Sequence, residues 1–467
     1  MQSRIWEGKL KGRLYILENT REIILDMLME ITAAKEYSHK VIGQVLEKYN
    51  YMSGQDKAFM KRVTEGTIER QIQIDYILNS FSNVKVNKMK PLIRNLLRMS
   101  VYQLLFMESI PDSAVCNEAV KLAVKRKFHN LKGFVNGVLR NIARNKETIQ
   151  YPDKQKEPVK ALSIMYSCPE WIVEMWIKEY GVELCEDILQ ALLEIHPVTV
   201  RFDETLVEKE LEEVLTELQK KAKHVDKQPY LPYAYTVTGA EGFANIPAFV
   251  EGKFTVQDVS SMLAVEAAGI RKGDFVLDVC AAPGGKSLHA ATKTGERGRV
   301  EARDVTERKT DLIEENKRRL KKDWVETKVW DAAVLDESMI ERADVVLADV
   351  PCSGLGILGK KRDIKYRVSE ESLEEVAKLQ KKIIDTVWQY VKPGGTLLYS
   401  TCTINRVENQ DMVLYITEKY PFETESLNDY LPRELWNETT EKGFLQFLPG
   451  VQESDGFFIA RLRRKAE

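Results

Sequence analysis

Long hydrophobic runs, an export signal and paired cysteines are all missing from this sequence. Its apolar stretches are shorter than the roughly 18–20 residues of a membrane-spanning helix, so we expect no membrane segment. Residues 1–7 lack the apolar core of a signal peptide, which predicts a cytoplasmic protein. Six cysteines are scattered among 467 residues without a CxxC pair, so we expect a reducing compartment, no disulfide framework and no metal site.

The net charge of -2 conceals an uneven distribution. Residues 1–150 carry ten excess positive charges, whereas the remaining residues carry twelve excess negative charges, and residues 121–146 contain no acid. A basic stretch on helices is typical of a surface that binds phosphate backbones, although a solvated helix face produces the same pattern. The candidate phosphate contacts are Lys121, Lys125, Arg126, Lys127, Lys132 and Arg140.

The chain divides into three predicted parts. In residues 1–150 apolar side chains recur at helical spacing, which predicts an all-α domain of about seven helices. Residues 151–250 begin with a hydrophilic, proline-containing linker and continue as a small α+β segment. Residues 251–467 alternate strands and helices, the pattern of a doubly wound α/β sheet.

Two cysteines in the third part follow short apolar runs. Residues 345–348 precede Cys352 and residues 396–399 precede Cys402, and both runs are typical of buried parallel strands. Ligands of such sheets bind beyond the carboxyl ends of the strands, so we expect both thiols to open onto one crevice. A cationic neighbour lowers the pKa of a thiol and makes it a competent nucleophile. Candidate neighbours are Lys286, Lys360, Lys361, Arg362 and Lys365.

A glycine turn follows the strand predicted at 275–279. It consists of Cys280, Ala281, Ala282, Pro283, Gly284, Gly285 and Lys286. Its end resembles a P-loop, but the first glycine of that motif would fall at Cys280, which excludes nucleoside triphosphate chemistry. Asp304 stands where a carboxylate binds ribose hydroxyls, and Asp331 follows the next strand, where it could receive an adenine amino group. A helix cap or a surface charge is the plain alternative for each acid.

Two thiols and an acid beside a nucleotide-type turn favour methyl transfer to a pyrimidine. The C5 carbon is a poor nucleophile, but a thiolate that adds to C6 makes C5 enamine-like, so that it attacks an electrophilic methyl group. A proton or hydrogen bond at N3 assists the addition, a role that suits Asp349. A base must then remove the C5 proton so that the enzyme is released.

These segments resemble the RNA cytosine-5 methyltransferases that use S-adenosylmethionine. The matching motifs are residues 254–261, 278–286, 349–354 and 400–403. The resemblance implies a Rossmann-like methyltransferase domain in which Cys402 attacks C6, Cys352 helps to release the product and Asp349 contacts the base. It also implies an S-adenosylmethionine site, lined by residues 280–286, Asp304, Asp331 and Asp349.

The first 145 residues resemble the NusB antitermination-factor domain, an RNA-binding module, most clearly in residues 132–140. Fusion of the two domains implies methylation of 16S ribosomal RNA, either naked or in an early small-subunit particle, and we expect a monomer. A transfer RNA substrate and a non-catalytic RNA-binding scaffold remain alternatives. Cys168 departs from the family, whose members usually have histidine there.

Overall fold

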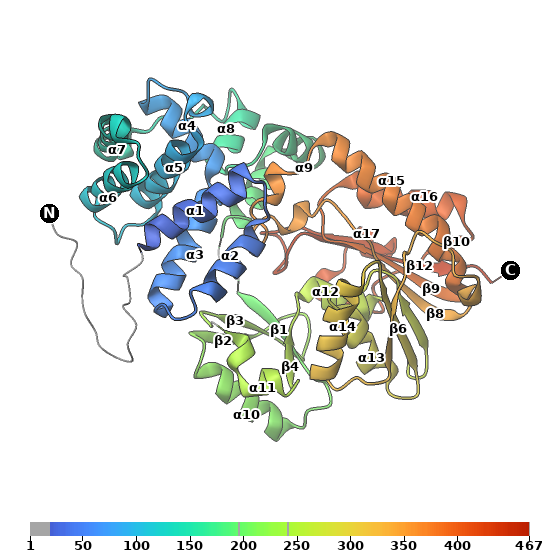
Figure 1. The fold of residues 1–467 in the computed structure, drawn as a ribbon. Helices are drawn as coiled ribbons and strands as arrows, with labels where there is room; N and C mark the ends of the chain where they lie inside the picture. Colours follow the sequence, from blue (N-terminus) through green and yellow to red (C-terminus); the bar gives the residue numbers. More distant parts are fainter. Residues whose placement is uncertain (1–18, 195–196, 241, 467) are drawn as a thin grey trace. The chain divides into compact units, whose positions relative to one another are not determined.

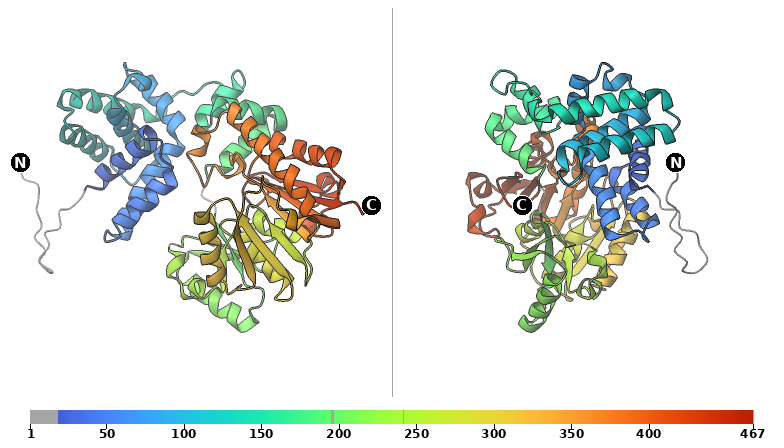
Figure 2. Two further views of the ribbon diagram at one scale, coloured as in Figure 1. Left: turned by 45° about the vertical axis from the view of Figure 1, so that its right-hand side comes forward. Right: turned by 90° about the vertical axis from the view of Figure 1, so that its left-hand side faces the viewer.

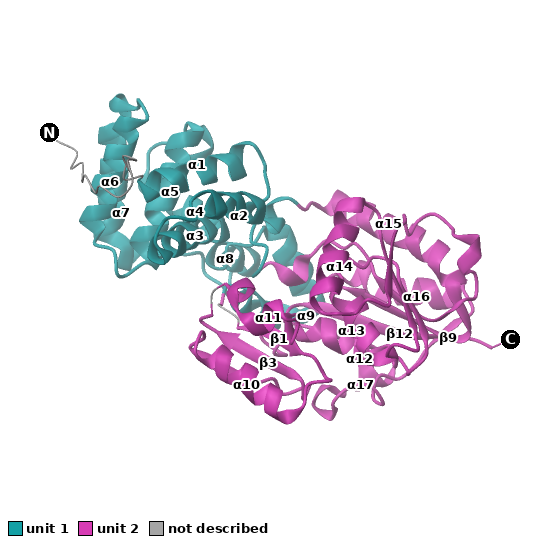
Figure 3. Ribbon diagram, turned by 60° about the horizontal axis from the view of Figure 1, so that its bottom comes forward, with its two compact units in different colours: residues 1–193, 359–367 teal, residues 194–358, 368–467 magenta. Residues whose placement is uncertain are grey.

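The computed structural model describes residues 19–194, 197–240 and 242–466. The chain forms two compact units, the first made of residues up to Leu193 together with Gly359–Arg367, the second of the rest (Figure 3). Residues 1–7, on which the prediction about export depends, lie outside the described residues. In the described part of the chain, no helix combines the length and the apolar character that crossing a membrane requires.

Helices make up the first unit, and the seven predicted before residue 150 are confirmed. They are α1 (Thr20–Ala33), α2 (Ser38–Lys48), α3 (Gly54–Glu69), α4 (Gln71–Phe81), α5 (Pro91–Phe106), α6 (Asp112–Lys125) and α7 (Lys132–Asn145). Two more follow, α8 (Pro158–Met165) and α9 (Glu170–Ala191). The last is kinked at Gly181, which has the non-helical angles φ 80° and ψ 170°.

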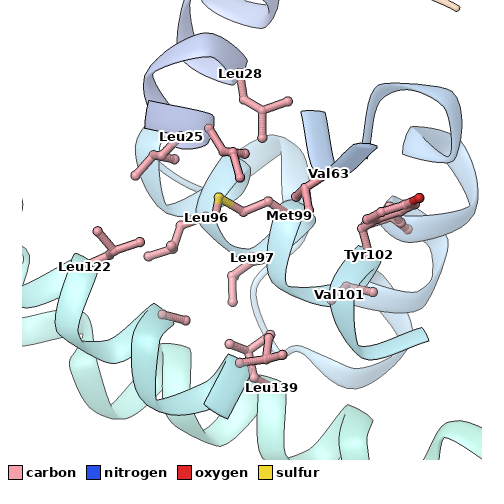
Figure 4. Close-up of a cluster of buried hydrophobic side chains, with 14 of the residues drawn as sticks. Leu25, Leu28, Val63, Leu96, Leu97, Met99, Val101, Tyr102, Leu122 and Leu139 are labelled. Atoms are coloured by element: carbon pink, nitrogen blue, oxygen red, sulfur yellow. The ribbon is translucent and has the colours of Figure 1, made fainter. Parts of the chain in front are cut away.

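Helix α5 is central to the core of this unit. Eleven of its sixteen residues are buried, and Figure 4 shows Leu96, Leu97 and Met99 among side chains from neighbouring helices. Tyr102 lies against the backbone of α3 at Gly66, where an added Cβ would stand 2.1 Å from the tyrosine ring. A helix that is apolar on nearly all sides must be enclosed by others, which explains the all-α architecture.

A four-stranded antiparallel sheet opens the second unit, with strand order β2-β3-β1-β4. Its strands are β1 (Val198–Phe202), β2 (His224–Lys227), β3 (Ala234–Thr238) and β4 (Phe254–Val256). Helices α10 (Glu208–Gln219) and α11 (Pro247–Val250) contribute Val214, Leu218 and Ala248 to the core that this sheet covers. The α+β character predicted for this region is thus confirmed.

The larger sheet has eight strands among the described residues and is doubly wound as predicted. They are β5 (Phe275–Asp278), β6 (Arg299–Asp304), β7 (Val325–Val329), β8 (Ala343–Asp349), β9 (Val391–Thr401), β10 (Phe422–Thr424), β11 (Phe444–Phe447) and β12 (Phe457–Arg464). The order is β10-β12-β9-β8-β5-β6-β7, with β11 paired to β12. Strands β5 to β9 are parallel, whereas β12 runs antiparallel to β9.

Helices cover both faces of this sheet (Figures 1 and 2). They are α12 (Val259–Ala267), α13 (Gly285–Thr294), α14 (Glu307–Arg319), α15 (Glu370–Val387), α16 (Gln410–Lys419) and α17 (Glu438–Glu441). Alternate residues of β8 face opposite ways: Val345 and Leu347 pack with α12 to α14, whereas Val346 packs with α15 and α16. This period of two decides which strand-end side chains face α13.

The sequence also predicts two irregular segments, a turn at residues 393–395 and a long basic loop at residues 355–368. The turn lies inside β9, which begins at Val391: the register with β8 shifts between Val391 and Thr396, and Gly394 has φ +72°. The loop has only two short 3-10 turns, Leu355–Ile357 and Ile364–Tyr366, and its part Gly359–Arg367 packs in the first unit. The segment is held there because Arg362 pairs with Glu69, and the Asp363 carboxylate accepts hydrogen bonds from Ser38.

Candidate active site

A crevice is expected where the strand order of the larger sheet reverses. From β5 the chain proceeds outward through β6 and β7, then returns to β8 on the other side of β5. In doubly wound sheets ligands bind outside the carboxyl ends of the strands at this point. Asp278 ends β5 and Asp349 ends β8, so two acids mark the position.

The glycine turn joins β5 to α13. Gly284 caps the helix with φ +100°, a left-handed conformation that favours glycine, and an added Cβ would stand 3.2 Å from Ile313. The Ala281 N–H donates to the Arg303 carbonyl at 2.8 Å, and Asn316 Nδ2 donates to the Pro283 carbonyl at 3.0 Å. The turn is therefore fixed from β6 and from α14.

The structure places the two predicted cofactor acids differently. Asp304 is buried and accepts a hydrogen bond from the Ala282 N–H at 3.0 Å, so it lies against the glycine turn. Its other oxygen accepts from the Val305 N–H at 2.8 Å. Asp331 is exposed, and its carboxylate accepts from the Ala333 N–H at 2.9 Å, a local turn contact. Of these two acids, Asp304 is the one that contacts the turn.

Lys286 lies opposite the acid of β8. Its Nζ is 2.7 Å from Asp349 Oδ2, and the Ser400 hydroxyl donates to Asp349 Oδ1 at 2.7 Å. Burial by itself would lower the pKa of Lys286, but Asp349, and then Asp278 and Cys402, raise it. Lys286 was one of the cations predicted as neighbours of a thiol, and the structure places it at the ends of the strands.

The two thiols meet at the ends of β8 and β9. Asp349 is the register partner of Ser400, so the residues that follow each strand stay close together. The Sγ atoms of Cys352 and Cys402 are 3.1 Å apart, and both residues are half-buried. The structure thus brings the two sulfur atoms together, and the crevice onto which both thiols are predicted to open stays a prediction.

The electrostatic surroundings of the two sulfur atoms differ. The hydrogen bond with Cys402 raises the pKa of Cys352, as do burial and the nearby Glu408 carboxylate. The Lys286 ammonium interacts electrostatically with Cys402. The surroundings of Cys352 thus favour its protonated form, whereas Cys402 lies in the field of a cation.

A buried carboxylate that sequence reasoning missed holds the loop of Cys352. Glu408 accepts hydrogen bonds from the Ser353 N–H at 2.9 Å and from the Ser353 hydroxyl at 2.5 Å. Gln380 Nε2 donates to it at 3.0 Å and Asn405 Nδ2 at 2.9 Å. The only sequence signal was an acid shortly after the Cys402 motif. Four donors on one fully buried carboxylate fix the position of the loop.

Comparisons with known proteins identify the family of the chain. Residues 267–463 match the family described as 16S rRNA methyltransferase RsmB/F, and residues 18–144 match the NusB family. Residues 168–242 match the ferredoxin-like domain of RsmF/B-like methyltransferases. A probable ribosomal RNA small subunit methyltransferase B of Bacillus subtilis is 35% identical, with 96% of this chain and 99% of that protein covered. The chain belongs to the RsmB/F methyltransferase family.

Other members of this family and solved structures match over much of the chain. The corresponding protein of Synechocystis is 28% identical, with coverage of 96% of this chain and 99% of that one. The crystal structure of PH0851 is 24% identical with a TM-score of 0.77 and covers 96% of this chain and 99% of that chain. The crystal structure of NSun6 from Pyrococcus horikoshii with SFG is 20% identical with a TM-score of 0.57. It covers 64% of this chain and 99% of that chain. These structures show the fold that this RsmB/F member shares.

The basic residues of α6 and α7 are partly neutralised in this RsmB/F member. Acids of α1 pair with two of them: Lys125 and Arg126 both contact Glu22, and Arg126 also contacts Asp26. Lys121 pairs with Glu118. Lys127, Lys132 and Arg140 form no ion pair within the described part of the chain. Residues 121–146 contain no acid, so this compensation from a distant helix escapes sequence reasoning.

The remaining cysteines lie apart from the thiol pair. Cys116, Cys168 and Cys185 are buried, as expected for packing residues, and burial raises the pKa of each. Burial also raises the pKa of Cys280, in the glycine turn. None of these four cysteines forms a pair like that of Cys352 and Cys402 among the described residues.

One cluster of potential metal ligands lies in the second unit. Ligand atoms of Glu204, Glu266 and His289 are within 4.8 Å of one another. The Lys293 ammonium stands 2.9 Å from Glu204 and 2.7 Å from Glu266, so a side-chain cation already balances the two carboxylates. Burial lowers the pKa of His289, which is therefore neutral. The two carboxylates and Lys293 thus form an ion-pair network beside the buried His289.

Proposed function

We propose that this protein transfers a methyl group from S-adenosylmethionine to C5 of a cytosine in 16S ribosomal RNA through a covalent Cys402 adduct. The observation that carries the proposal is the pair of sulfur atoms 3.1 Å apart beside the Lys286–Asp349 ion pair. A thiol near a cation and a thiol whose pKa is raised provide the two different groups that addition and release require.

In the first step Cys402 acts as nucleophile. The thiolate forms an S–C6 bond, and the C5–C6 double-bond electrons make C5 nucleophilic as N3 gains a proton or hydrogen bond. Asp349 is proposed to contact the base at N3, held in place by Lys286 and Ser400. The Lys286 ammonium stabilises the Cys402 thiolate before the attack.

Release follows methyl transfer to C5. A base takes the C5 proton, the electrons of that C–H bond restore the C5–C6 double bond, and the C6–S bond breaks to return the Cys402 thiolate. Cys352, in contact with Cys402, is proposed to assist this step. The hydrogen bonds between Glu408 and Ser353 keep the loop of Cys352 in position.

The residues at the glycine turn fit S-adenosylmethionine. The N-terminus of α13 suits the carboxylate of the ligand, and the Asp304 carboxylate at the turn suits ribose hydroxyls. Residues 280–286, Asp304, Asp331 and Asp349 are the proposed lining. When bound, S-adenosylmethionine supplies an electrophilic methyl group.

The RNA is proposed to contact the basic helices. Phosphate contacts would come from Lys121, Lys125, Arg126, Lys127, Lys132 and Arg140. Cytosine is proposed to leave its stack to reach the thiols. In this proposal residues 1–150 bind RNA, residues 151–250 link the domains, and residues 251–467 catalyse. The substrate is naked 16S ribosomal RNA or an early small-subunit particle, bound by a monomer in the cytoplasm.

The thiol roles are tested by replacing each cysteine. Cys402→Ala should abolish methyl transfer, because no nucleophile remains, while calorimetric binding of S-adenosylmethionine changes less than a few-fold. Cys352→Ala should accumulate a covalent protein–RNA adduct, seen as a slower band on denaturing gels. Cys116→Ala, a change outside the site, is the control and should methylate normally. Methylation by Cys402→Ala, or no slower band with Cys352→Ala, would contradict the respective role.

The substrate is tested by bisulfite mapping in cells that lack the protein. We expect one methylcytosine to disappear from 16S ribosomal RNA while transfer RNA is unchanged. Loss from transfer RNA would support the alternative substrate instead. An unchanged pattern in both RNAs would support a scaffold without methylation activity.

A further inference from the structure

A cavity of about 480 Å³ lies in the first unit, and neither Cys352 nor Cys402 lines it. Helices α1 and α5 line it together with the segment Gly359–Arg367. Arg94 and Arg98 also line a neighbouring cavity of about 330 Å³, so α5 borders both. The polar residues that line the larger cavity include Thr32, Lys35, Arg94, Arg98, Asp363 and Arg367.

Two arginines of the larger cavity are already paired with acids. Arg98 donates to both oxygens of Asp75, at 2.7 and 2.5 Å. Arg367 Nε donates to Asp363 at 2.8 Å. Neither of these guanidinium charges is left to bind a ligand by itself, because each is balanced by a carboxylate.

Arg94 is different. Its guanidinium has no ion pair among the described residues, and its Nε atom is buried without a hydrogen-bond acceptor. Burial lowers the pKa of Arg94, and the charge of Arg98 lowers it further, while Asp75 acts in the opposite direction from a distance. Lys35 also lines the cavity and has no ion pair in the described part of the chain. The cavity thus has an excess of positive charge.

A buried guanidinium donor without an acceptor costs free energy, which an anion in the cavity would recover. The planar fork of arginine matches the oxygens of a phosphate, and the volume is in the range of sites that hold a nucleotide-sized group. A phosphate fits better than a carboxylate because two unpaired cations face the same space, and a phosphodiester offers two non-bridging oxygens.

The walls of the cavity are held in place. Asp363 accepts hydrogen bonds from the Ser38 N–H at 3.1 Å and hydroxyl at 2.6 Å. Lys365 donates to the Glu69 carbonyl at 2.8 Å, and Tyr366 donates to the Ile68 carbonyl at 2.9 Å. The segment begins seven residues after Cys352 in the chain. A ligand in this cavity would contact the segment Gly359–Arg367, which follows the loop of Cys352 in the chain.

We propose that Arg94 and the cavity around it bind a backbone phosphate of the RNA substrate. The proposal rests on the proposed function, because that function makes RNA the substrate. It adds an anchor on α5, separate from the basic residues of α6 and α7. Arg94 supplies the charged donor, and Lys35 supplies a second cation.

Salt-dependent RNA binding by the full-length protein tests this site. Arg94→Gln should weaken binding of a labelled single-stranded RNA about five-fold or more, and the slope of log affinity against log salt should become shallower by about 0.7, the value for one phosphate contact. Lys61→Gln, which removes an exposed cation of α3 outside the cavity, is the matched control and should change the slope less. Equal slopes for wild type and Arg94→Gln would overturn the proposal.

Thermal unfolding, with and without inorganic phosphate, separates RNA binding from a structural role of Arg94 and from a site for free anions. If Arg94 binds a ligand, Arg94→Gln should not lower Tm, because no protein hydrogen bond is lost, and Arg94→Lys should restore part of the affinity. A lower Tm with unchanged RNA binding would indicate a structural role and overturn the proposal. Phosphate that raises the Tm of wild type but not of Arg94→Gln, with RNA binding unchanged, would indicate a free-anion site and also overturn it.

The test is independent of catalysis. If wild type methylates RNA but Arg94→Gln binds it equally well, only the phosphate site is wrong. If wild type binds RNA with the expected Arg94 dependence but never methylates cytosine, the proposed reaction is wrong.

Discussion

Two acids that end neighbouring strands have different surroundings. Asp349 pairs with Lys286, whereas Asp278 is 1% exposed and accepts a hydrogen bond from the Ser287 hydroxyl at 2.6 Å. Burial raises the pKa of Asp278 to about 7, and the negative charge of Asp349 contributes, although the Ser287 hydrogen bond acts in the opposite direction. The acid of β5 is thus partly protonated at neutral pH, while the acid of β8 has a cation as partner.

This raised pKa predicts a pH-dependent stability. Between about pH 4 and pH 7 the native state holds a proton on Asp278 that the unfolded state has lost, so stability falls as pH rises, by at most about 1.4 kcal/mol per pH unit. Asp278→Asn lacks this proton and should become more stable relative to wild type toward pH 7. Urea denaturation at several pH values measures the difference. Ser287→Ala should extend the fall to higher pH, and parallel curves for wild type and Asp278→Asn would contradict the assignment.

At the scale of elements, the turn between β5 and α13 depends on adjacent glycines with different roles. Gly284 needs a left-handed backbone, and its Cβ position faces Ile313. Gly285 begins the helix, and an added Cβ would make only ordinary contacts, the nearest 3.8 Å away on Gln257. The two glycines look equivalent in the sequence. Of the two, only Gly284 has a backbone conformation that favours glycine.

Alanine substitutions should separate the two positions. Gly284→Ala should lower the free energy of unfolding by about 1–3 kcal/mol, because a residue with a Cβ is strained at this φ. Gly285→Ala should change it by less than about 0.5 kcal/mol, since Ala is accepted in a helix. Chemical denaturation of both variants provides the comparison. Equal losses would mean that the conformation of Gly284 is not the cause.

At the scale of the whole molecule, one segment belongs to a different unit from the residues on either side of it in the chain. Gly359–Arg367 lies between residues of the second unit in the chain but is part of the first. Burial alone would raise the pKa of Asp363, but hydrogen bonds from Ser38 and the charge of Arg367 lower it. The carboxylate therefore stabilises the fold in its charged form.

Asp363→Asn should destabilise the protein by about 2 kcal/mol, the size of a charge-assisted hydrogen bond in a buried setting. The Asp363 contribution is present above about pH 4 and is lost as pH falls through the lowered native pKa, so the two proteins should converge in acid. Thermal unfolding at pH 7 and pH 3 checks both parts. Asp429→Asn, at an exposed position, is the control. A gap that persists undiminished at pH 3 would exclude this origin.

Much of the fold was predictable because it depends on local periodicity. Apolar residues at helical spacing predicted seven helices in the first part, and short apolar runs that end in Asp349 and before Cys402 predicted parallel strands. The short strands β2 and β4 were missed, since four and three residues carry little pattern. The turn predicted at 393–395 lies inside β9, and only the pairing with β8, which resumes at Thr396 after Val391, reveals that the strand also includes residues before the turn.

The sequence alone determined which residue types stand at the strand ends: acids as the last residues of β5, β6 and β8, and thiols after β8 and β9. Only the tertiary structure decided which of these side chains contact one another, because such contacts between residues distant in the sequence depend on packing and not on a local pattern. Lys286, and not Lys365, pairs with Asp349 at the end of β8. Glu408 accepts hydrogen bonds from the loop that carries Cys352, and acids of α1 pair with basic residues at the end of α6. Arg94 likewise gained significance only when α5 and a remote segment enclosed it in a cavity.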